Sequence, residues 1–272
     1  MQRDSVQNVI VVSLGVCLVC SVIVSFAAVS LRPKQEENQR IEFQRNILVA
    51  ASLWDAAEGK PTNGSGTIPE VFESSVEKHL VDLDTGEYVK PEDVDFNIDE
   101  YVAKQAAKDP AMSQQLPPAE DIASIKRREK YAFVYEVKGS DGSVEQYVFP
   151  IRGYGLWSTL RGFLALGKDL KTVQGITYYE HAETPGLGGE VDSPVWKAKW
   201  KDKIALDDEG DVVLNVIKGS VDTAGDPDAA YKVDGLSGAT ITTKGVDNMI
   251  HYWLGEHGFG PFITKIKTEG GN

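Results

Sequence analysis

Cysteine is nearly absent from this chain. Two cysteines, Cys17 and Cys20, occur among 272 residues, and both lie within a hydrophobic run near the N-terminus. The remaining sequence therefore cannot form a disulfide framework or bind an iron–sulfur cluster through cysteine thiolates. Any redox chemistry in that part must come from a bound organic cofactor. The Cys17-x-x-Cys20 spacing is best explained by helix packing in a membrane, because no partner ligand accompanies it.

Positive charge is also in short supply. The chain has 28 lysines and arginines against 41 aspartates and glutamates, for a formal net charge of −13. An acidic surface repels phosphate backbones, so we expect no nucleic acid partner. Internal repeats and low-complexity tracts are lacking as well. The length and the 42% hydrophobic content indicate one or two globular domains with a substantial core.

An uncharged hydrophobic run covers residues 9–31, after a short N-terminal tail of residues 1–8. About 23 residues of helix reach about 35 Å, which is enough to cross a bilayer. A cleaved signal peptide is the alternative, with Ser25–Ala28 as an acceptable cleavage context, but its apolar region is usually shorter. A lipoprotein is disfavoured because the usual small residues do not precede either cysteine. We therefore predict a retained single-pass transmembrane helix.

Residues 32–124 combine helical periodicity with loops and carry no catalytic constellation. Helices are predicted over residues 36–55, 71–83 and 101–108, and a loop rich in proline and glycine separates the first two. We expect these residues to form a helical and loop-rich lobe.

Strand patterns begin after residue 125. Residues 131–137 and 144–149 alternate aromatic and β-branched residues around the turn Gly139–Gly142, which predicts a β-hairpin. Further strands are predicted at 163–166, 172–179 and 212–217, and helices after Pro194 and from Lys244. The predicted fold class is α+β, with one N-terminal transmembrane helix followed by a mixed, largely antiparallel sheet domain with flanking helices. This domain is expected to span residues 125–262, with a C-terminal tail of residues 263–272.

The first candidate binding segment is Ile151–Ser158, in which glycines and aromatic residues alternate. It partly resembles a dinucleotide-binding loop, but the third glycine and the acidic residue that would bind a ribose are missing. NAD binding by this chain is therefore rejected. Aromatic residues beside glycines suit a flat ring, although an aromatic packing corner would use the same residues. The candidate contacts for a ring are Tyr154, Gly155, Leu156 and Trp157.

The second candidate segment covers residues 181–189. His181 and Glu183 would suit a metal ion, but no third or fourth ligand is spaced to join them, so we predict no metal site. Pro185–Gly186 requires a tight turn, and Gly188–Gly189 allows a backbone or a ligand to approach closely. A plain loop between a strand and a helix remains the alternative.

The third segment, Asp-Gly-Leu-Ser-Gly-Ala-Thr-Ile-Thr-Thr at residues 234–243, is the most informative. Apolar residues recur at helical spacing from Val246 to Trp253, so the hydroxyl side chains lie where a helix begins. Unpaired N–H groups and the helix dipole make such a place favourable for a phosphate. The alternative is that Thr242 or Thr243 only caps the helix while the glycines shape the turn.

The third segment closely resembles the signature at which a bacterial flavin transferase attaches FMN to a threonine. The resemblance implies one covalent FMN per chain, in a phosphoester with the last threonine of Ser-Gly-Ala-Thr, here Thr240. Residues 181–188 resemble the second signature of the same FMN-binding domain family, a segment that lies along the flavin. No catalytic residue is expected. The flavin contacts that the two signatures imply are Asp234, Ser237, Gly238, Ala239, Thr242, Thr243, Thr184, Gly186, Leu187 and Gly188.

Over most of its length the chain resembles the NqrC family, the C subunits of sodium-translocating NADH:quinone oxidoreductases. The resemblance implies an electron-transfer subunit without an active site of its own, in a complex that oxidises NADH with ubiquinone and translocates Na⁺. The implied partners are the membrane, the other subunits, especially the B, D and E subunits, and a periplasmic FMN transferase. The implied location is the bacterial inner membrane, with the FMN domain in the periplasm. Charge favours the opposite orientation, because four basic residues follow the span between Arg32 and Arg45, and we give the resemblance more weight.

Two other functions stay open at this point. The equivalent FMN subunit of an Rnf-type ferredoxin:NAD oxidoreductase shares the attachment chemistry, although the longer stretch of residues 35–123 favours the quinone-linked complex. A flavin-free, anchored binding or assembly domain would use residues 237–243 only as a helix cap. A flavin-dependent enzyme with its own substrate lacks candidate catalytic residues.

Overall fold

The computed structural model describes residues 5–269. The chain divides into two units at the junction between Phe43 and Gln44, and a single long helix runs through that junction. The second unit contains the sheet and all three candidate segments, so it is the part that positions the site.

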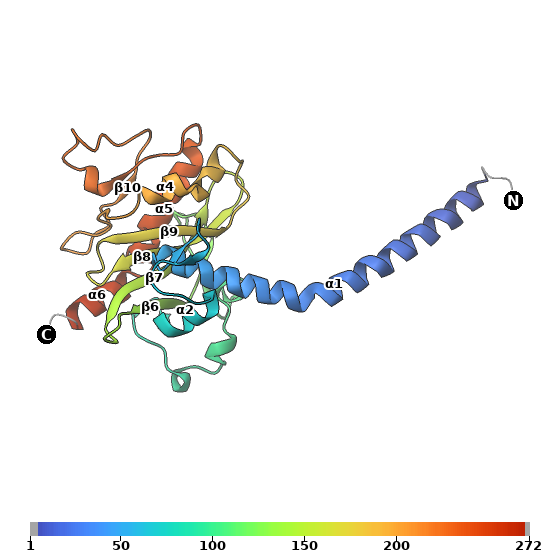
Figure 1. The fold of residues 1–272 in the computed structure, drawn as a ribbon, viewed down its shortest axis with the longest axis horizontal. Coiled ribbons are helices and arrows are strands. Elements are labelled where there is room, and N and C mark those ends of the chain that lie inside the picture. Colours follow the sequence, from blue (N-terminus) through green and yellow to red (C-terminus); the bar gives the residue numbers. More distant parts are fainter. Residues whose placement is uncertain (1–4, 270–272) are drawn as a thin grey trace. The chain divides into compact units, whose positions relative to one another are not determined.

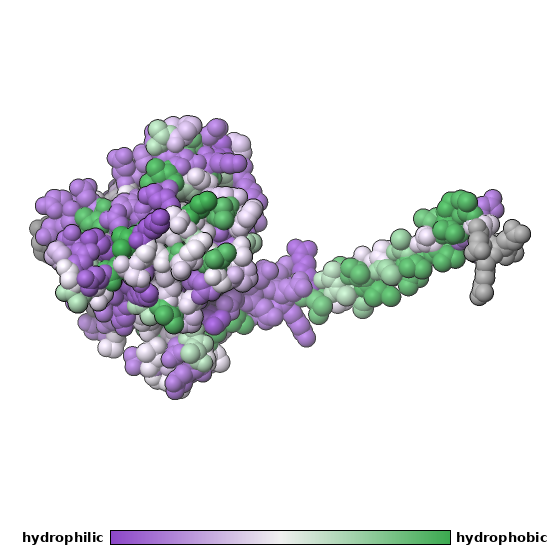
Figure 2. Space-filling model, turned by 90° about the horizontal axis from the view of Figure 1, so that it is seen from above, coloured by the Kyte–Doolittle hydropathy of each residue, from purple (hydrophilic) through white to green (hydrophobic). Residues whose placement is uncertain are grey.

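The long helix, α1 (Val6–Ala50), changes character along its length. The side chains of residues 9–31 are exposed and almost all apolar, and Figure 2 shows them as a hydrophobic sleeve followed by a hydrophilic stretch. In that stretch Arg32 pairs with Glu36 at 2.8 Å and Arg40 with Glu37 at 2.9 Å. The helix is long and apolar enough to cross a membrane.

The centre of the second unit is a five-stranded antiparallel sheet in the order β3-β6-β7-β8-β9 (Figure 1). Neighbouring strands along β6 to β9 follow one another in sequence, as expected for hairpin connections. The predicted hairpin is confirmed, since Tyr135 pairs with Val148 across the turn. The strands are β3 (Val76–Asp82), β6 (Tyr131–Lys138), β7 (Val144–Tyr154), β8 (Thr159–Gly167) and β9 (Val173–Glu180).

Both faces of this sheet are covered, because alternate side chains of each strand enter different layers. On one face, Gly153 of β7 lies so close to α5 (Thr240–Leu254) that an added Cβ would be 2.8 Å from Met249 Cβ. The helix buries its predicted apolar side there, including Met249 and Trp253. On the other face the end of α1 packs with Ile47 and Leu48 fully buried, and Thr177 of β9 donates its hydroxyl hydrogen to the carbonyl oxygen of Asn46 at 3.0 Å.

Short elements complete the unit. Two two-stranded antiparallel sheets are formed by β1 with β2 and by β4 with β5, and β10 pairs with β11 in parallel. Their bounds are β1 (Trp54–Asp55), β2 (Lys60–Pro61), β4 (Ser113–Gln115), β5 (Arg127–Glu129), β10 (Asn215–Val216) and β11 (Lys232–Val233). The remaining helices are α2 (Ile68–Ser75), α3 (Ala103–Ala106), α4 (Pro194–Ala198), α6 (Gly260–Glu269) and the 3₁₀ turns η1 (Pro91–Asp93), η2 (Ile98–Glu100), η3 (Gly188–Asp192) and η4 (Ala229–Tyr231).

The fold class is confirmed, but three local predictions are wrong. The helix predicted over 71–83 ends at Ser75, because residues 76–82 pair with β6 as β3 and this tertiary pairing overrides the helical pattern. Part of the lobe predicted over 32–124 therefore belongs to the main sheet. The buried strand predicted at 212–217 is reduced to Asn215–Val216. The C-terminal tail predicted from residue 263 lies in α6, which buries Phe262 and Ile263 against the core.

Candidate functional site

The third segment ends where α5 begins, and its hydroxyl side chains have different surroundings. Thr240 is the first residue of the helix and is exposed, as is Ser237 in the preceding turn. Thr242 and Thr243 are only 1% and 4% exposed. Of the four hydroxyls in this segment, two are therefore open to a reaction partner and two are not.

The cap interpretation of this segment is wrong for α5. The N-cap residue is Ala239, which has no side-chain hydrogen bond to offer. The Thr243 hydroxyl instead accepts from the backbone N–H of Leu236 at 2.9 Å and so closes the turn that precedes the helix. The first N–H groups of a 15-residue helix thus remain without a capping side chain. This end of α5 is favourable for an anion.

Asp234 holds the other end of the segment. Its carboxylate accepts from the backbone N–H of Val221 at 2.9 Å and pairs with Lys199, while its carbonyl oxygen accepts from the Trp196 indole N–H at 2.8 Å. Partial burial opposes ionisation, but the hydrogen bonds from Lys199 and Val221 outweigh it and lower the pKa of Asp234. Asp234 therefore supports the segment from within the fold.

Glu183 brings the three candidate segments together. The residue is 5% exposed, and its carboxylate accepts hydrogen bonds from the N–H groups of Leu156 at 3.2 Å, Trp157 at 3.0 Å and Ser158 at 3.0 Å. It also accepts from the hydroxyls of Ser158 at 3.0 Å and Thr242 at 2.8 Å. We call Glu183 and these four donor residues the Glu183 cluster. Burial opposes ionisation, but the bonds from Thr242, Trp157, Leu156 and Ser158 outweigh it and lower the pKa of Glu183.

Two of the predicted flavin contacts are glycines that this cluster requires. A Cβ added to Gly155 would be 2.7 Å from Glu183 Oε1. A Cβ added to Gly188 would be 2.6 Å from Thr242 Oγ1 and 2.8 Å from Glu183 Oε2. Gly188 is itself buried. At both positions the missing side chain leaves room for the carboxylate, which is a sufficient reason for glycine there.

An exposed apolar rim lies around the cluster. We define the rim as Tyr154, Leu156, Trp157 and Leu187, which are 45%, 39%, 66% and 43% exposed. Leu187 reaches the third segment, because an added Cβ on Gly238 would lie 2.9 Å from its Cδ2. Tyr154 reaches α5 through its carbonyl oxygen, which would clash with a Cβ added to Gly245. Thr184 and Gly186 are also exposed, whereas Ala239 is buried.

Both ring nitrogens of His181 lie beside partners within the fold. Its Nδ1 accepts from the backbone N–H of Glu183 at 3.3 Å, and its Nε2 lies 3.6 Å from Asp192 Oδ2. The Glu183 carboxylate accepts from five neutral donors, an arrangement that competes with metal binding.

A different acidic group on the sheet, Glu77, His79 and Glu136, brings potential ligand atoms within 4.8 Å of one another. The Lys138 ammonium already bonds Glu136 at 2.8 Å and lies 3.3 Å from Glu77. This lysine supplies the positive charge that a metal ion would otherwise bring.

Comparison with known proteins identifies the family. Residues 155–255 match the FMN-binding domain family. The C subunit of the Na(+)-translocating NADH-quinone reductase of Pseudomonas aeruginosa is 48% identical over 265 residues, covering 97% of both chains. The C subunit from Yersinia pestis is 43% identical and covers 97% of this chain and 94% of its own. The chain belongs to this NqrC family.

Solved structures of the family have the same fold. The crystal structure of NqrC from Shewanella oneidensis superposes with a TM-score of 0.73 at 36% identity, covering 85% of this chain and 99% of that one. The C subunit from Parabacteroides distasonis gives a TM-score of 0.61 at 25% identity, over 86% and 97% of the two chains. Family membership and the apolar part of α1 together make this chain a membrane-anchored subunit of an oxidoreductase complex.

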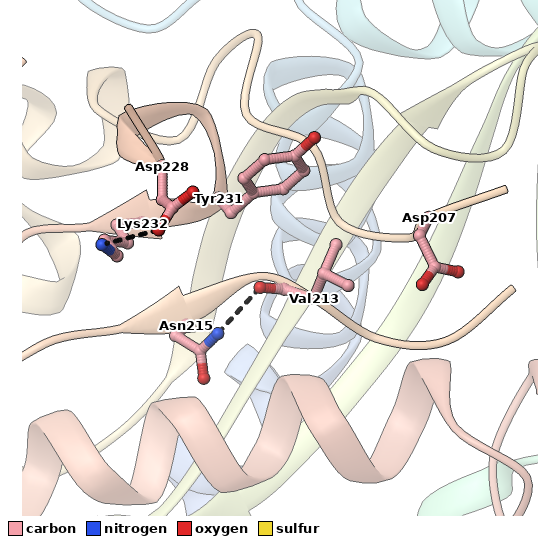
Figure 3. A pocket seen from close by; sticks show the side chains of 6 residues that line it. All are labelled: Asp207, Val213, Asn215, Asp228, Tyr231 and Lys232. Carbon is pink, nitrogen blue, oxygen red and sulfur yellow. Dashed lines mark hydrogen bonds and ion pairs between the residues drawn. The ribbon is translucent and has the colours of Figure 1, made fainter. Parts of the chain in front are cut away.

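None of the predicted flavin contacts is among the residues that line an open pocket beside β10 and β11. That pocket has a volume of about 330 Å³, and Figure 3 shows Asp228 and Lys232 on one side of it and Asp207 on the other. Within this pocket region Lys232 bonds Asp226 at 2.7 Å and lies 3.6 Å from Asp228. The residues that line it are Asp207, Val213, Asn215, Asp228, Tyr231 and Lys232.

Sequence reasoning missed Glu183 as the centre of the site and Lys199 as the partner of Asp234. Local spacing presents Glu183 only as half of a metal pair, because its donors Leu156 and Thr242 are 27 and 59 residues away in sequence. The sequence did offer one signal for Glu183: it lies between glycine-rich segments, and no lysine or arginine is near it in sequence to pair with its carboxylate.

Proposed function

We propose that FMN is attached through a phosphoester to Thr240, one per chain, and that this flavin relays electrons within the sodium-translocating NADH:quinone oxidoreductase complex. The observation that supports attachment at Thr240 is the difference in exposure among the four hydroxyl side chains of the third segment. Thr242 and Thr243 are buried and engaged in the fold, whereas Thr240 is exposed at the first residue of α5. Ser237 is exposed too, but it lies three residues before the helix.

The electrostatics of this helix end support a phosphate on Thr240. A phosphoester carries negative charge, and the uncapped N–H groups at the start of α5 can donate to it. In the attachment step the Thr240 oxygen replaces AMP on the FMN phosphorus of FAD. The new P–O bond forms as the diphosphate bond breaks, and the hydroxyl proton passes to the transferase.

The rim supports a flavin ring beside this attachment point. Trp157 and Leu187 offer exposed apolar surface from two different loops, and Leu187 contacts the attachment segment. Bound FMN would supply the one- and two-electron redox chemistry, while this chain holds the ring and sets its surroundings. Such a carrier needs no general base or nucleophile of its own. A covalent tether also prevents loss of an exposed cofactor.

The relatives' names support the place of this carrier in a complex. They are subunits of a Na(+)-translocating NADH-quinone reductase, and the chain matches nearly their whole length. We propose the B, D and E subunits as neighbours and ubiquinone as the final electron acceptor of the complex. None of these relatives and solved structures is an Rnf-type subunit, so no specific observation favours that alternative.

The attachment is tested by the intact mass of the full chain, purified after co-expression with a flavin transferase. We expect an added mass of one FMN less one water in the wild type and in Thr223→Ala, which removes an exposed threonine in another loop. Thr240→Ala should lack the added mass. Loss in Ser237→Ala with retention in Thr240→Ala would move the acceptor to Ser237. No added mass in any variant would favour a flavin-free binding or assembly role.

The orientation needs its own test, because the transferase and the FMN domain must lie on the same side of the membrane. We propose the periplasmic side. In Thr223→Cys the new thiol lies outside the apolar run that holds Cys17 and Cys20. A membrane-impermeant maleimide should label it in intact spheroplasts. Labelling only after the membrane is opened would place the domain in the cytoplasm.

A further inference from the structure

We propose that Glu183 is the positioning residue of the flavin site, and that its carboxylate fixes the turn carrying Trp157 against the start of α5. This inference rests on the proposed attachment at Thr240. It deepens that proposal by naming the group that shapes the surface on which the flavin would lie.

The turn joins β7 to β8, and outside the Glu183 cluster the Tyr154 hydroxyl donates to the Trp157 carbonyl oxygen at 3.3 Å. Within residues 155–158, one backbone hydrogen bond, from Gly155 N–H to the Ser158 carbonyl oxygen at 2.9 Å, closes the turn. The three other amides, of Leu156, Trp157 and Ser158, all donate to Glu183. The Trp157 side chain is 66% exposed, so packing constrains it weakly. The position of the Trp157 indole therefore depends on the backbone bond from Trp157 to Glu183, which is 26 positions away in sequence.

The same carboxylate reaches the attachment helix. Oε1 accepts from Trp157 N–H and from both donors of Ser158, and Oε2 accepts from Leu156 N–H and the Thr242 hydroxyl. Thr242 is two residues after Thr240 in α5. A second tie runs through Ser158, whose hydroxyl oxygen accepts from the Ala182 N–H at 2.9 Å. The Glu183 carboxylate thus links the turn and helix α5 to the loop that contains Glu183.

Only an ionised acid fits this set of donors. A carboxylate offers about four lone-pair sites and carries no hydrogen, so each of the five donors faces an acceptor oxygen, and three of them share Oε1. A glutamine would place an NH₂ group on one side. If its oxygen takes the Oε1 position, the NH₂ faces the Leu156 N–H and leaves that partly buried donor without its acceptor. The Thr242 hydroxyl can rotate and accept a hydrogen bond from the new NH₂ group, so the lost hydrogen bond should be the one in the turn.

The test is amide hydrogen exchange of the full chain in detergent, comparing wild type, Glu183→Gln and Glu190→Gln. Glu190 makes the matched control because it is an exposed glutamate in the same loop. We expect exchange at residues 156–158 to be faster by about tenfold or more in Glu183→Gln, relative to the amides of β7 and β8, because partly buried bonds of these amides are lost or weakened. Unchanged exchange at 156–158 would overturn the proposal.

The same comparison is made in the Thr240→Ala background, which separates this inference from the attachment. If wild type acquires no flavin mass, the proposed function fails, but the exchange at residues 156–158 still reports on Glu183. If wild type and Glu183→Gln both acquire the flavin mass, we also expect a changed visible circular dichroism in Glu183→Gln alone. An unchanged flavin spectrum together with a loosened turn would overturn the claim that Glu183 shapes the flavin's surroundings.

A second variant covers the case in which Glu183→Gln does not fold. Thr242→Val removes one donor while keeping the side-chain volume nearly constant. We expect a smaller but measurable increase in exchange at residues 156–158, because Oε2 loses its tie to α5. Exchange at those residues equal to that of wild type would count against the cluster.

Discussion

The carboxylate of Asp234 accepts a hydrogen bond from the backbone N–H of Val221 at 2.9 Å, which joins the chain after β11 to the chain after β10. Next to this bond, Gly235 donates its N–H to the Gly219 carbonyl oxygen at 2.8 Å. The segment that carries Thr240 therefore rests on residues 219–221. Asp234 thus supports this segment through its bonds within the fold.

Asp234→Ala should therefore slow flavin attachment and also destabilise the fold. Removing the carboxylate leaves the Val221 N–H without its acceptor, a loss of about 1–3 kcal/mol in the free energy of unfolding. Lys199→Ala removes only the half-exposed ion pair and should cost less. The measurements are thermal unfolding and the rate of FMN transfer. Slower transfer by Asp234→Ala with wild-type stability would favour direct recognition instead.

Trp157→Ala and Leu187→Ala should keep the flavin mass but change the flavin's absorption, fluorescence or potential. Both side chains are exposed, so their removal should leave the fold intact while it removes apolar surface from the rim. Val195→Ala is the control, because Val195 is 73% exposed in α4 and lies outside the rim. Visible spectroscopy and a redox titration of the purified chain decide the question. Properties identical to wild type in both rim variants would remove these residues from the site.

The stability of the full chain should fall in acid, in part through Glu183 and Asp234. The pKa of each is lowered in the folded state, so each contributes stability that is present above its unfolded pKa, about 4 for these residue types. That contribution is lost as the pH falls through the lower folded pKa. Unfolding midpoints measured between about pH 6 and pH 3 should therefore decrease. The decrease should be shallower in Glu183→Gln, and parallel curves would contradict this assignment.

Local pattern was enough to predict the hairpin and the existence of α5, because alternation and helical spacing are properties of neighbouring residues, but α5 begins at Thr240, four residues before the predicted start at Lys244. It failed at residues 76–82, whose strand depends on pairing with β6, a strand far along the chain that begins only at Tyr131. The site shows the same division. The signature around Thr240 drew attention to residues 234–243, but Ser237, Thr240, Thr242 and Thr243 are chemically similar in sequence. Only burial and distant partners such as Glu183 separate them.

Gly155→Ala should destabilise the turn more than Gly186→Ala, although both replace a loop glycine beside the site. At Gly155 the added methyl group would lie 2.7 Å from Glu183 Oε1, and the carboxylate cannot retreat without losing its bonds to Leu156 and Trp157. We expect a loss of about 1–3 kcal/mol together with faster amide exchange at residues 156–158. At Gly186 the added group meets open space, and the cost of about 1–2 kcal/mol comes from its φ of +75°. Exchange at residues 156–158 should then stay at the wild-type rate, so equal exchange in the two variants would show that the Glu183 cluster does not constrain the turn.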